Sequence, residues 1–256
     1  MQSAELVPRE HLSEEKYGKV LCYPKYDSEE LRRRLTELEE LKIETIEFTG
    51  DKKVDNTSVL GKGYVGVVVA AHTRTSKVAL KIRRLDADRV SMQHEGRMLK
   101  HANAAGVGPK LLDVTKNFLV MEFIEGKLLP EWIRDLEGTE TSANICGVLE
   151  RILEQCWALD AAGLDHGQLS RAPKHIIVDE NDRPCIVDFE TASTNRRTSN
   201  VTSISHYLFI GSRLAREITQ KHDQTNKPQL MDALNTYKRR PTRRNFEEIL
   251  DHLGFI

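Results

Sequence analysis

Residues 60–68 read Leu60-Gly61-Lys62-Gly63-Tyr64-Val65-Gly66-Val67-Val68, with three glycines spaced Gly-x-Gly-x-x-Gly. Glycine lets a backbone turn approach a polyphosphate closely, because it has no β-carbon and tolerates unusual φ values. The spacing alone is ambiguous. A dinucleotide-binding turn uses the same glycines but runs from a strand into a helix, with an acid about 20 residues later, where this chain has Asp86. The residues after the glycines therefore decide the fold.

The segment after the glycines has the pattern of two strands and not of a helix. Val65–Ala71 is rich in β-branched residues, residues 72–76 are polar and turn-like, and Lys77–Ile82 is a second apolar run. A glycine-rich loop between strands, followed by Val-Ala-Leu-Lys, is the arrangement found in kinases. The residues predicted here to contact a nucleotide are Gly61, Lys62, Gly63, Tyr64, Gly66, Val68, Ala79 and Lys81.

Lys81 is predicted to hold the α- and β-phosphates of ATP through its ammonium group. The kinase arrangement also requires a glutamate on a helix to pair with this lysine. Residues 93–101 are predicted to form that helix and to supply Glu95. An alternative stays open, in which Glu95 is an exposed helix acid and Lys81 pairs with Asp86 or Asp88.

The next apolar run, Asn117–Gly126, is predicted to be a strand that leaves the first lobe. Its end would form the hinge between two lobes. Backbone groups of Glu122, Phe123 and Ile124 would then hydrogen-bond the adenine edge of the nucleotide, a role that leaves little trace in the side chains.

A candidate metal site lies in Arg183-Pro184-Cys185-Ile186-Val187-Asp188-Phe189-Glu190. An apolar strand there ends in an acid followed by an aromatic residue, which resembles the Asp-Phe-Gly element of kinases. Asp188 is predicted to bind Mg²⁺, which bridges phosphate oxygens and neutralises the charge that develops during transfer. Glu190 replaces the usual glycine and adds a carboxylate that would help to hold a second ion.

Residues 164–178, with the sequence LDHGQLSRAPKHIIV, occupy the position of a catalytic loop. Protein kinases have an aspartate base there and, five residues later, an asparagine that binds Mg²⁺. Counting back from Asp188 puts His175 at the asparagine position and Ser170 at the aspartate position. Anchoring on the His-Gly pair instead puts Gln168 at the base position, with two residues inserted before His175. Neither alignment restores an aspartate.

Phosphoryl transfer needs mainly alignment and charge neutralisation, so a polar group that orients the acceptor hydroxyl would suffice without a strong base. Asp165 and Glu190 are the carboxylates near enough in sequence to accept a proton. Arg171 and Lys174 would face the γ-phosphate, or they would only stabilise the end of the loop. The predicted catalytic residues are Lys81, Glu95, Asp165, His166, Gln168, Ser170, Arg171, Lys174, His175 and Asp188, and the predicted metal ligands are His175, Asp188 and Glu190.

With these residues laid out, the chain resembles the small atypical kinases: the Rio kinases, the kinase of the tRNA threonylcarbamoyladenosine complex and, most closely, an archaeal group of predicted Ser/Thr kinases. The resemblance runs from about Val59 to the C-terminus, and its most specific parts are His166 to His175 and Asp188 to Ser193. It implies a two-lobed α+β fold of the protein-kinase type, with a mostly antiparallel sheet in the first lobe and a reduced helical second lobe. Members of the archaeal group include RNA kinases that phosphorylate a ribose 2′-hydroxyl of tRNA. The resemblance thus implies this activity, with ATP and Mg²⁺ as cofactors.

Three regions are expected along the chain. Residues 1–58 form an N-terminal extension on the small lobe, with a helix over Ser28–Leu41 that has Ser28 as its N-cap and a strand over Ile43–Phe48. Residues 59–125 form the first kinase lobe, and residues 126–256 form the second. In the second lobe we expect a helix over Ser212–Lys221, a loop over His222–Pro228 and a terminal helix near Asn245–Leu253.

The segment after the predicted metal motif contains no Ala-Pro-Glu element. Ordinary protein kinases use that segment to seat a peptide substrate. Its absence favours an RNA acceptor, with tRNA as the expected partner. A Rio-like Ser/Thr protein kinase with a protein substrate is one alternative, and a nucleotide-binding pseudokinase scaffold is another.

The formal net charge of −1 provides no overall attraction to nucleic acid, so RNA binding would need local clusters of cations. Residues 238–244 are the densest such cluster, with five cations in seven positions. Contacts from it to phosphates would be independent of base sequence and sensitive to salt. The predicted RNA-binding candidates are Arg196, Arg197, Lys238, Arg239, Arg240, Arg243 and Arg244.

The chain's 256 residues and 39% hydrophobic content are enough for a sizeable core, and we assume a monomer. The cysteines Cys22, Cys146, Cys156 and Cys185 form no Cys-x-x-Cys pair. We therefore expect reduced thiols in a cytoplasmic protein. The sequence shows no basic leader with an apolar core and no apolar stretch long enough to cross a bilayer.

Overall fold

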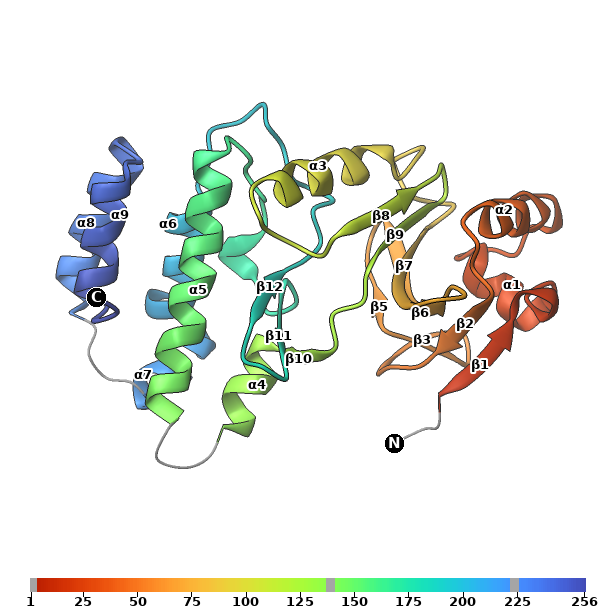
Figure 1. Cartoon of the computed structure of the whole chain (residues 1–256), viewed down its shortest axis with the longest axis horizontal. Helices are drawn as coiled ribbons and strands as arrows, with labels where there is room; N and C mark the ends of the chain where they lie inside the picture. Colours follow the sequence, from red (N-terminus) through yellow and green to blue (C-terminus); the bar gives the residue numbers. More distant parts are fainter. Residues whose placement is uncertain (1–3, 137–140, 222–225) are drawn as a thin grey trace. The chain divides into compact units, whose positions relative to one another are not determined.

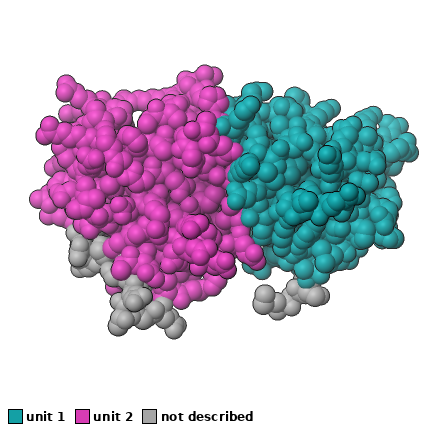
Figure 2. Space-filling model, viewed as in Figure 1, with its two compact units in different colours: residues 1–100, 110–123 teal, residues 101–109, 124–256 magenta. Residues whose placement is uncertain are grey.

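The computed structural model describes residues 4–136, 141–221 and 226–256. These residues form two units, drawn in teal and magenta in Figure 2. The first unit consists of the chain up to Lys100 together with Lys110–Phe123, and the second consists of His101–Pro109 and Ile124–Ile256. The chain thus enters the second unit within helix α3 (Gln93–Ala104), returns at Lys110 and leaves again after Phe123.

The first unit is built on an antiparallel sheet (Figure 1). Its strands run in the order β1-β2-β6-β7-β9-β8, and the short strand β5 also pairs with β6. The prediction of two strands after the glycines is confirmed, since β6 and β7 pair from Gly66↔Arg83 to His72↔Lys77. The bounds are β1 (Glu5–Pro8), β2 (Thr45–Phe48), β5 (Gly61–Lys62), β6 (Gly66–His72), β7 (Lys77–Arg83), β8 (Leu111–Val114) and β9 (Phe118–Glu122), and a separate hairpin pairs β3 (Lys52–Val54) with β4 (Thr57–Val59).

Two helices of the N-terminal extension, α1 (Glu15–Leu21) and α2 (Ser28–Glu40), belong to the first unit. The spacing of Leu31 and Leu38 puts both on one face of α2, and both are buried in the core that the sheet strands share. Helix α2 begins after Asp27, whose carboxylate accepts a hydrogen bond from the Glu30 amide at 2.8 Å. The prediction of Ser28 as the N-cap is therefore wrong by one residue, because Asp27 supplies the acceptor.

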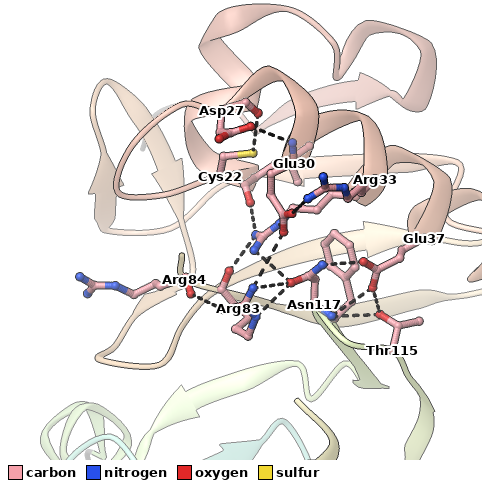
Figure 3. Close-up of polar contacts among 12 residues, drawn as sticks. Cys22, Asp27, Glu30, Arg33, Glu37, Arg83, Arg84, Thr115 and Asn117 are labelled. Atoms are coloured by element: carbon pink, nitrogen blue, oxygen red, sulfur yellow. Dashed lines mark hydrogen bonds and ion pairs between the residues drawn. The ribbon is translucent and has the colours of Figure 1, made fainter. Parts of the chain in front are cut away.

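Buried and half-buried polar side chains connect α2 to the sheet, and Figure 3 shows most of them. The Glu37 carboxylate accepts hydrogen bonds from the Thr115 hydroxyl and from the Asn117 amide, the latter at 3.0 Å. The guanidinium of Arg34 is completely buried and donates to the Arg83 carbonyl oxygen at 2.7 Å and to Oδ1 of Asn117 at 3.2 Å. The extension therefore shares both the core and the hydrogen bonds of the sheet.

The second unit combines a three-stranded sheet with helices. Its strands pair antiparallel in the order β10-β11-β12, and the long helix α5 packs against β12 and α6. The mixed architecture of the two units confirms the predicted fold class. The bounds are β10 (Gly126–Leu128), α4 (Leu129–Asp135), α5 (Thr141–Ala161), β11 (Ile176–Asp179), β12 (Pro184–Ile186), α6 (Asn200–Ser205), α7 (Arg213–Lys221), α8 (Lys227–Arg239) and α9 (Arg243–His252).

The helices predicted over residues 212–221 and 245–253 are present as α7 and α9, but α8 was not predicted. Residues 222–225 of the predicted loop lie outside the described residues, and Lys227 and Pro228 already belong to α8. The loop prediction fails at these two positions because proline is accepted in the first turn of a helix, where its missing N–H would have no partner. The Asn226 side chain caps this helix by accepting from the Gln229 amide at 3.3 Å.

The four cysteines are free thiols, which confirms that they form no disulfide. Burial raises the pKa of the Cys156 thiol well above its usual value, so this group is uncharged at neutral pH. Within the described ranges, the structure contains no helix that combines the length and the apolar character needed to span a bilayer.

Candidate active site

The glycine-rich loop forms a tight turn between β5 and β6. The Gly63 amide donates to the Gly66 carbonyl oxygen at 2.8 Å. Gly66 has no room for a β-carbon, which would lie 2.9 Å from the Ile82 carbonyl oxygen and 3.0 Å from the side chain of Lys81. Tyr64, at the tip, is 91% exposed. At Gly66 the loop thus brings backbone without a side chain close to Lys81, as the binding of phosphate groups requires.

Strand β7 carries Lys81, whose Nζ lies 2.9 Å from Oε1 of Glu95 on α3. Both side chains are buried, with exposed fractions of 6% and 4%. The predicted pair is therefore formed. Asp86 instead binds the guanidinium of Arg84 at 2.7 Å, and Asp88 is exposed. Because the buried acid restrains the ammonium group, Lys81 presents its charge in a defined direction.

Further predicted nucleotide contacts lie on strands β6, β7 and β9 and in the segment that follows β9. Val68 on β6 is half-buried, and Ala79 on β7 is buried. Glu122 ends β9, and its amide donates to the Lys110 carbonyl oxygen at 2.9 Å, so that amide is already engaged. Residues 123–124 lie outside any helix or strand, where the chain passes between the units. Their backbone is the better candidate for binding an adenine edge.

His166 is completely buried at the start of the predicted catalytic loop. Its Nε2 donates to the carbonyl oxygen of Val187 at 3.1 Å, and its ring meets that of Phe189 edge-on, with 5.0 Å between centroids. Burial, and then the nearby ring of His175, lower the pKa of His166 to about 4. The imidazole is therefore neutral at physiological pH, with its proton on the nitrogen that faces the carbonyl group. These contacts give His166 a positioning role, because they tie the loop to the metal motif.

The polar residues of the catalytic loop differ in exposure. Gln168 is half-buried, whereas Ser170, Arg171 and Lys174 are exposed. Gln168 precedes a 3₁₀ turn over residues 169–171, on which Ser170 lies. The two alignments thus place either the half-buried amide of Gln168 or the exposed hydroxyl of Ser170 at the position of the base.

Asp188 and Glu190 follow β12 and bring two carboxylates together, since one oxygen of each lies within 4.8 Å of the other. Asp188 has a φ of +70°, a left-handed conformation that is unusual for a residue other than glycine. Such conformations persist where the surroundings impose them, often at functional sites. Carboxylate oxygens are the ligands that Mg²⁺ prefers, whereas the imidazole of His175 is a poorer ligand for it. Asp188 and Glu190 therefore fit a divalent cation better than His175 does.

The geometry of both units agrees with a comparison against known protein families. A family model described as the RIO domain matches residues 66–202, more than half of the chain. The chain belongs to the RIO domain family. It is therefore a kinase-like phosphotransferase of the atypical type, as the motifs predict. The uncharacterized protein MJ1211 of Methanocaldococcus jannaschii is 29% identical to this chain over 100 residues, which are 39% of the chain and 81% of that protein.

Asp165 has a structural place in this RIO domain. Its side chain is almost completely buried, and its carboxylate accepts from the guanidinium of Arg196 and from the amide and hydroxyl of Ser199, the last two at 3.0 and 3.1 Å. Its backbone pairs with Ser193 in a single antiparallel bridge. Because its oxygens already accept these hydrogen bonds, Asp165 is a positioning residue here and a poor acceptor for a substrate proton.

Asn200, the first residue of α6, was not predicted and anchors the catalytic loop. Its Oδ1 accepts from the His166 amide at 2.8 Å, and its Nδ2 donates to the Leu164 carbonyl oxygen at 2.7 Å. Asp160 holds Asn200 in turn by accepting from its backbone amide at 2.9 Å and from its Nδ2 at 2.8 Å. These partners lie 34 to 40 residues away along the chain, so no local sequence pattern marks Asn200.

Replacing Asn200 with alanine is expected to lower the free energy of unfolding by about 2–4 kcal/mol, because the buried His166 amide and Leu164 carbonyl group lose their partner. Urea denaturation measures this change. Asn195→Ala is the matched control. Asn195 lies five positions before Asn200, and its side chain is exposed. The Asn195→Ala change should alter the free energy of unfolding by less than about 0.5 kcal/mol. Equal stability of the two variants would contradict the anchoring role.

All seven predicted RNA-binding cations are exposed to some degree, but three of them make contacts that join distant parts of the chain. Arg196 binds Asp165, and Arg197 donates to the carbonyl oxygen of Lys238. Arg243 donates to Glu154 at 2.7 and 2.8 Å and covers the ring of Trp157 at 4.9 Å. These three arginines support the fold. We name the other four the α8–α9 cluster, which consists of Lys238, Arg239, Arg240 and Arg244. In this cluster Arg244 makes a surface ion pair with Glu248 at 3.7 Å and keeps 88% of its side chain exposed.

Proposed function

We propose that this RIO domain protein is an ATP-dependent kinase that transfers the γ-phosphate of ATP to a ribose 2′-hydroxyl of tRNA. The observation that carries the proposal is the buried pair of Lys81 and Glu95 beside a glycine-rich loop. A lysine that is held by a buried acid and lies next to the backbone of a glycine-rich loop is well suited to bind a polyphosphate.

Side chains and backbone groups of both units have a defined part in the proposed reaction. Lys81 and the loop backbone would bind the phosphates of ATP, and residues 123–124 would bind adenine. Asp188 and Glu190 would hold Mg²⁺, which neutralises charge on the phosphate oxygens when it is bound. The proximity of these two carboxylates, within 4.8 Å, supports this assignment.

The reaction forms a bond between the acceptor oxygen and the γ-phosphorus and breaks the bond from that phosphorus to the β–γ bridging oxygen, so that ADP leaves. The acceptor hydroxyl releases its proton to solvent as the new bond forms. Gln168 or Ser170 would orient the hydroxyl through a hydrogen bond, since the loose transition state makes a strong base unnecessary. Arg171 and Lys174, exposed on the same loop, would offset the charge of the transferred phosphate.

Two features of the second unit support RNA as the acceptor. Residues 189–199 are the whole connection between Asp188 and helix α6, and they contain no Ala-Pro-Glu segment that would seat a peptide. The α8–α9 cluster presents exposed cations that would contact backbone phosphates. A ribose hydroxyl lies beside a phosphodiester group, so a positive surface would favour its approach.

A Rio-like Ser/Thr protein kinase is the second candidate, because the RIO domain family consists of atypical protein kinases. Incubation with γ-labelled ATP and Mg²⁺, with total tRNA in one reaction and total cell protein in another, separates the two. We expect label in tRNA, recovered as a 2′-phosphorylated nucleotide after nuclease digestion. Label confined to protein would reject the tRNA proposal. Nucleotide binding without any transfer would also reject it and would support a pseudokinase scaffold.

Changing the four residues of the α8–α9 cluster to alanine is expected to weaken tRNA binding by about tenfold or more and to reduce its salt dependence by about one phosphate contact per residue. Fluorescence anisotropy at several salt concentrations measures both effects. A variant with Lys25, Lys52, Lys53 and Arg74 changed to alanine is the control, since it removes the same formal charge from exposed positions in the first unit. Equal loss of binding in both variants would mean that the cluster has no specific role.

A further inference from the structure

We propose that Tyr23 and Arg84 are positioning residues that hold the glycine-rich loop in the conformation in which it receives phosphates. The inference rests on the proposed function, because it assigns the loop to nucleotide binding. The observations themselves lie within the first unit, where the N-terminal extension meets the end of strand β7.

Arg84 follows β7 and contacts the loop through its backbone and its side chain. Its amide donates to the Val65 carbonyl oxygen at 2.8 Å, and its Nη1 donates to the Gly63 carbonyl oxygen at 2.8 Å. The other edge of the guanidinium binds the Asp86 carboxylate with hydrogen bonds of 2.8 and 2.7 Å. Asp86 thus fixes the plane of the Arg84 guanidinium, whose Nη1 contacts the loop.

Tyr23 provides the surface on which two cations lie. The guanidinium carbon of Arg84 is 4.8 Å from the centre of the Tyr23 ring, and Nζ of Lys62, a loop residue, is 4.3 Å from it. The Tyr23 carbonyl oxygen accepts from the Leu85 amide at 2.8 Å, which attaches this part of the extension to the residue after Arg84. Cations at these distances from an aromatic face are attracted by its quadrupole.

These contacts set the direction of two peptide planes at the tip of the loop. In a trans peptide the carbonyl oxygen and the following N–H point in opposite directions. With the Gly63 and Val65 carbonyl oxygens both turned toward Arg84, the amides of Tyr64 and Gly66 point away from it. Aligned amides of this kind are the groups with which a glycine-rich loop binds phosphate oxygens.

A loop with three glycines loses much conformational freedom when it closes on a ligand. Contacts that order the loop in advance lower this cost and so raise affinity. The loop's own hydrogen bond, from the Gly63 amide to the Gly66 carbonyl oxygen, closes the turn but does not join it to the rest of the unit. Arg84 and Tyr23 make that connection.

The test compares Arg84→Ala and Tyr23→Leu with wild type in two measurements, hydrogen exchange of residues 61–66 without nucleotide and calorimetric titration with Mg²⁺·ATP. We expect faster exchange in the loop and a dissociation constant raised by about tenfold in both variants. Tyr23→Phe keeps the ring and should behave as wild type. Arg84→Lys keeps the charge without the fork and should fall between wild type and Arg84→Ala.

Arg74→Ala is the control, since Arg74 is exposed at the turn between β6 and β7 and lies 3.6 Å from Glu44. It should leave both measurements unchanged. Wild-type exchange and affinity in folded Arg84→Ala and Tyr23→Leu proteins would overturn the inference. If wild type binds no Mg²⁺·ATP, the proposed function fails instead, and the exchange experiment still decides whether the two residues order the loop.

Discussion

Replacing Lys81 with methionine should lower the rate of phosphotransfer by about 10³-fold, because the ammonium group that orients the phosphates is lost. The same change leaves the buried Glu95 side chain, which is 4% exposed, without the lysine that lies 2.9 Å away. We therefore also expect a loss of about 3–5 kcal/mol in the free energy of unfolding. Label transfer from γ-labelled ATP and urea denaturation measure the two effects.

A double variant separates the two consequences of losing Lys81. In Lys81→Met/Glu95→Gln both members of the pair are uncharged, so most of the lost stability should return while activity stays absent. Lys53→Met is the control, since Lys53 is an exposed lysine in the β3–β4 hairpin of the same unit. Recovery of activity along with stability in the double variant would show that Lys81 serves the fold alone.

The second large effect is expected at Arg34, the completely buried arginine of α2. Arg34→Met should destabilise the protein by about 3–5 kcal/mol, because the carbonyl oxygens of Leu21 and Arg83 lose a charged donor. Oδ1 of Asn117 loses Arg34 as well but keeps its hydrogen bonds from Arg83 at 3.0 and 2.8 Å. The ion pair of Arg34 with Glu30 at 3.0 Å is also lost.

The neighbouring residue is the matched control. The side chain of Arg33 is 68% exposed and pairs with Glu29 and Glu30 at 3.6 and 3.3 Å on the surface of the same helix. Arg33→Met should change the free energy of unfolding by less than about 1 kcal/mol, because exposed ion pairs contribute little. Similar urea midpoints for the two variants would contradict the assignment of Arg34 as the residue that fastens the extension to the sheet.

The residues that could be predicted from the sequence are those whose environment is encoded locally. The glycine spacing and the two strands after it lie in one continuous segment. The sequence therefore predicts the loop, the position of Lys81 on a strand and the pairing of β6 with β7. The sequence likewise places Asp188 and Glu190 just after an apolar strand, where the structure has them, and their binding of a metal ion stays a prediction. Asn200 was missed because its role depends on Asp160 and on backbone groups of residues 164 and 166, far away along the chain.

Charge patterns were the least reliable guide. The run at residues 238–244 suggests a uniform basic surface, yet Arg243 is bound by Glu154 and covers Trp157. The Arg32-Arg33-Arg34 run holds one fully buried member, Arg34, beside the exposed Arg33. Consecutive residues of a helix point in different directions, and which of them meets another element depends on the packing of that element.

The sequence by itself determined the family and the order of strands around the glycine-rich loop. It also determined the residue types that would bind phosphate and metal. Short-range spacing and alternation encode these features. The tertiary structure alone decided which cations support the fold, which buried groups hold the catalytic loop, and how Tyr23 and Arg84 of the first unit meet the glycine-rich loop. Those features depend on hydrogen bonds and ring contacts between residues tens of positions apart, and such contacts exist only once the chain has folded.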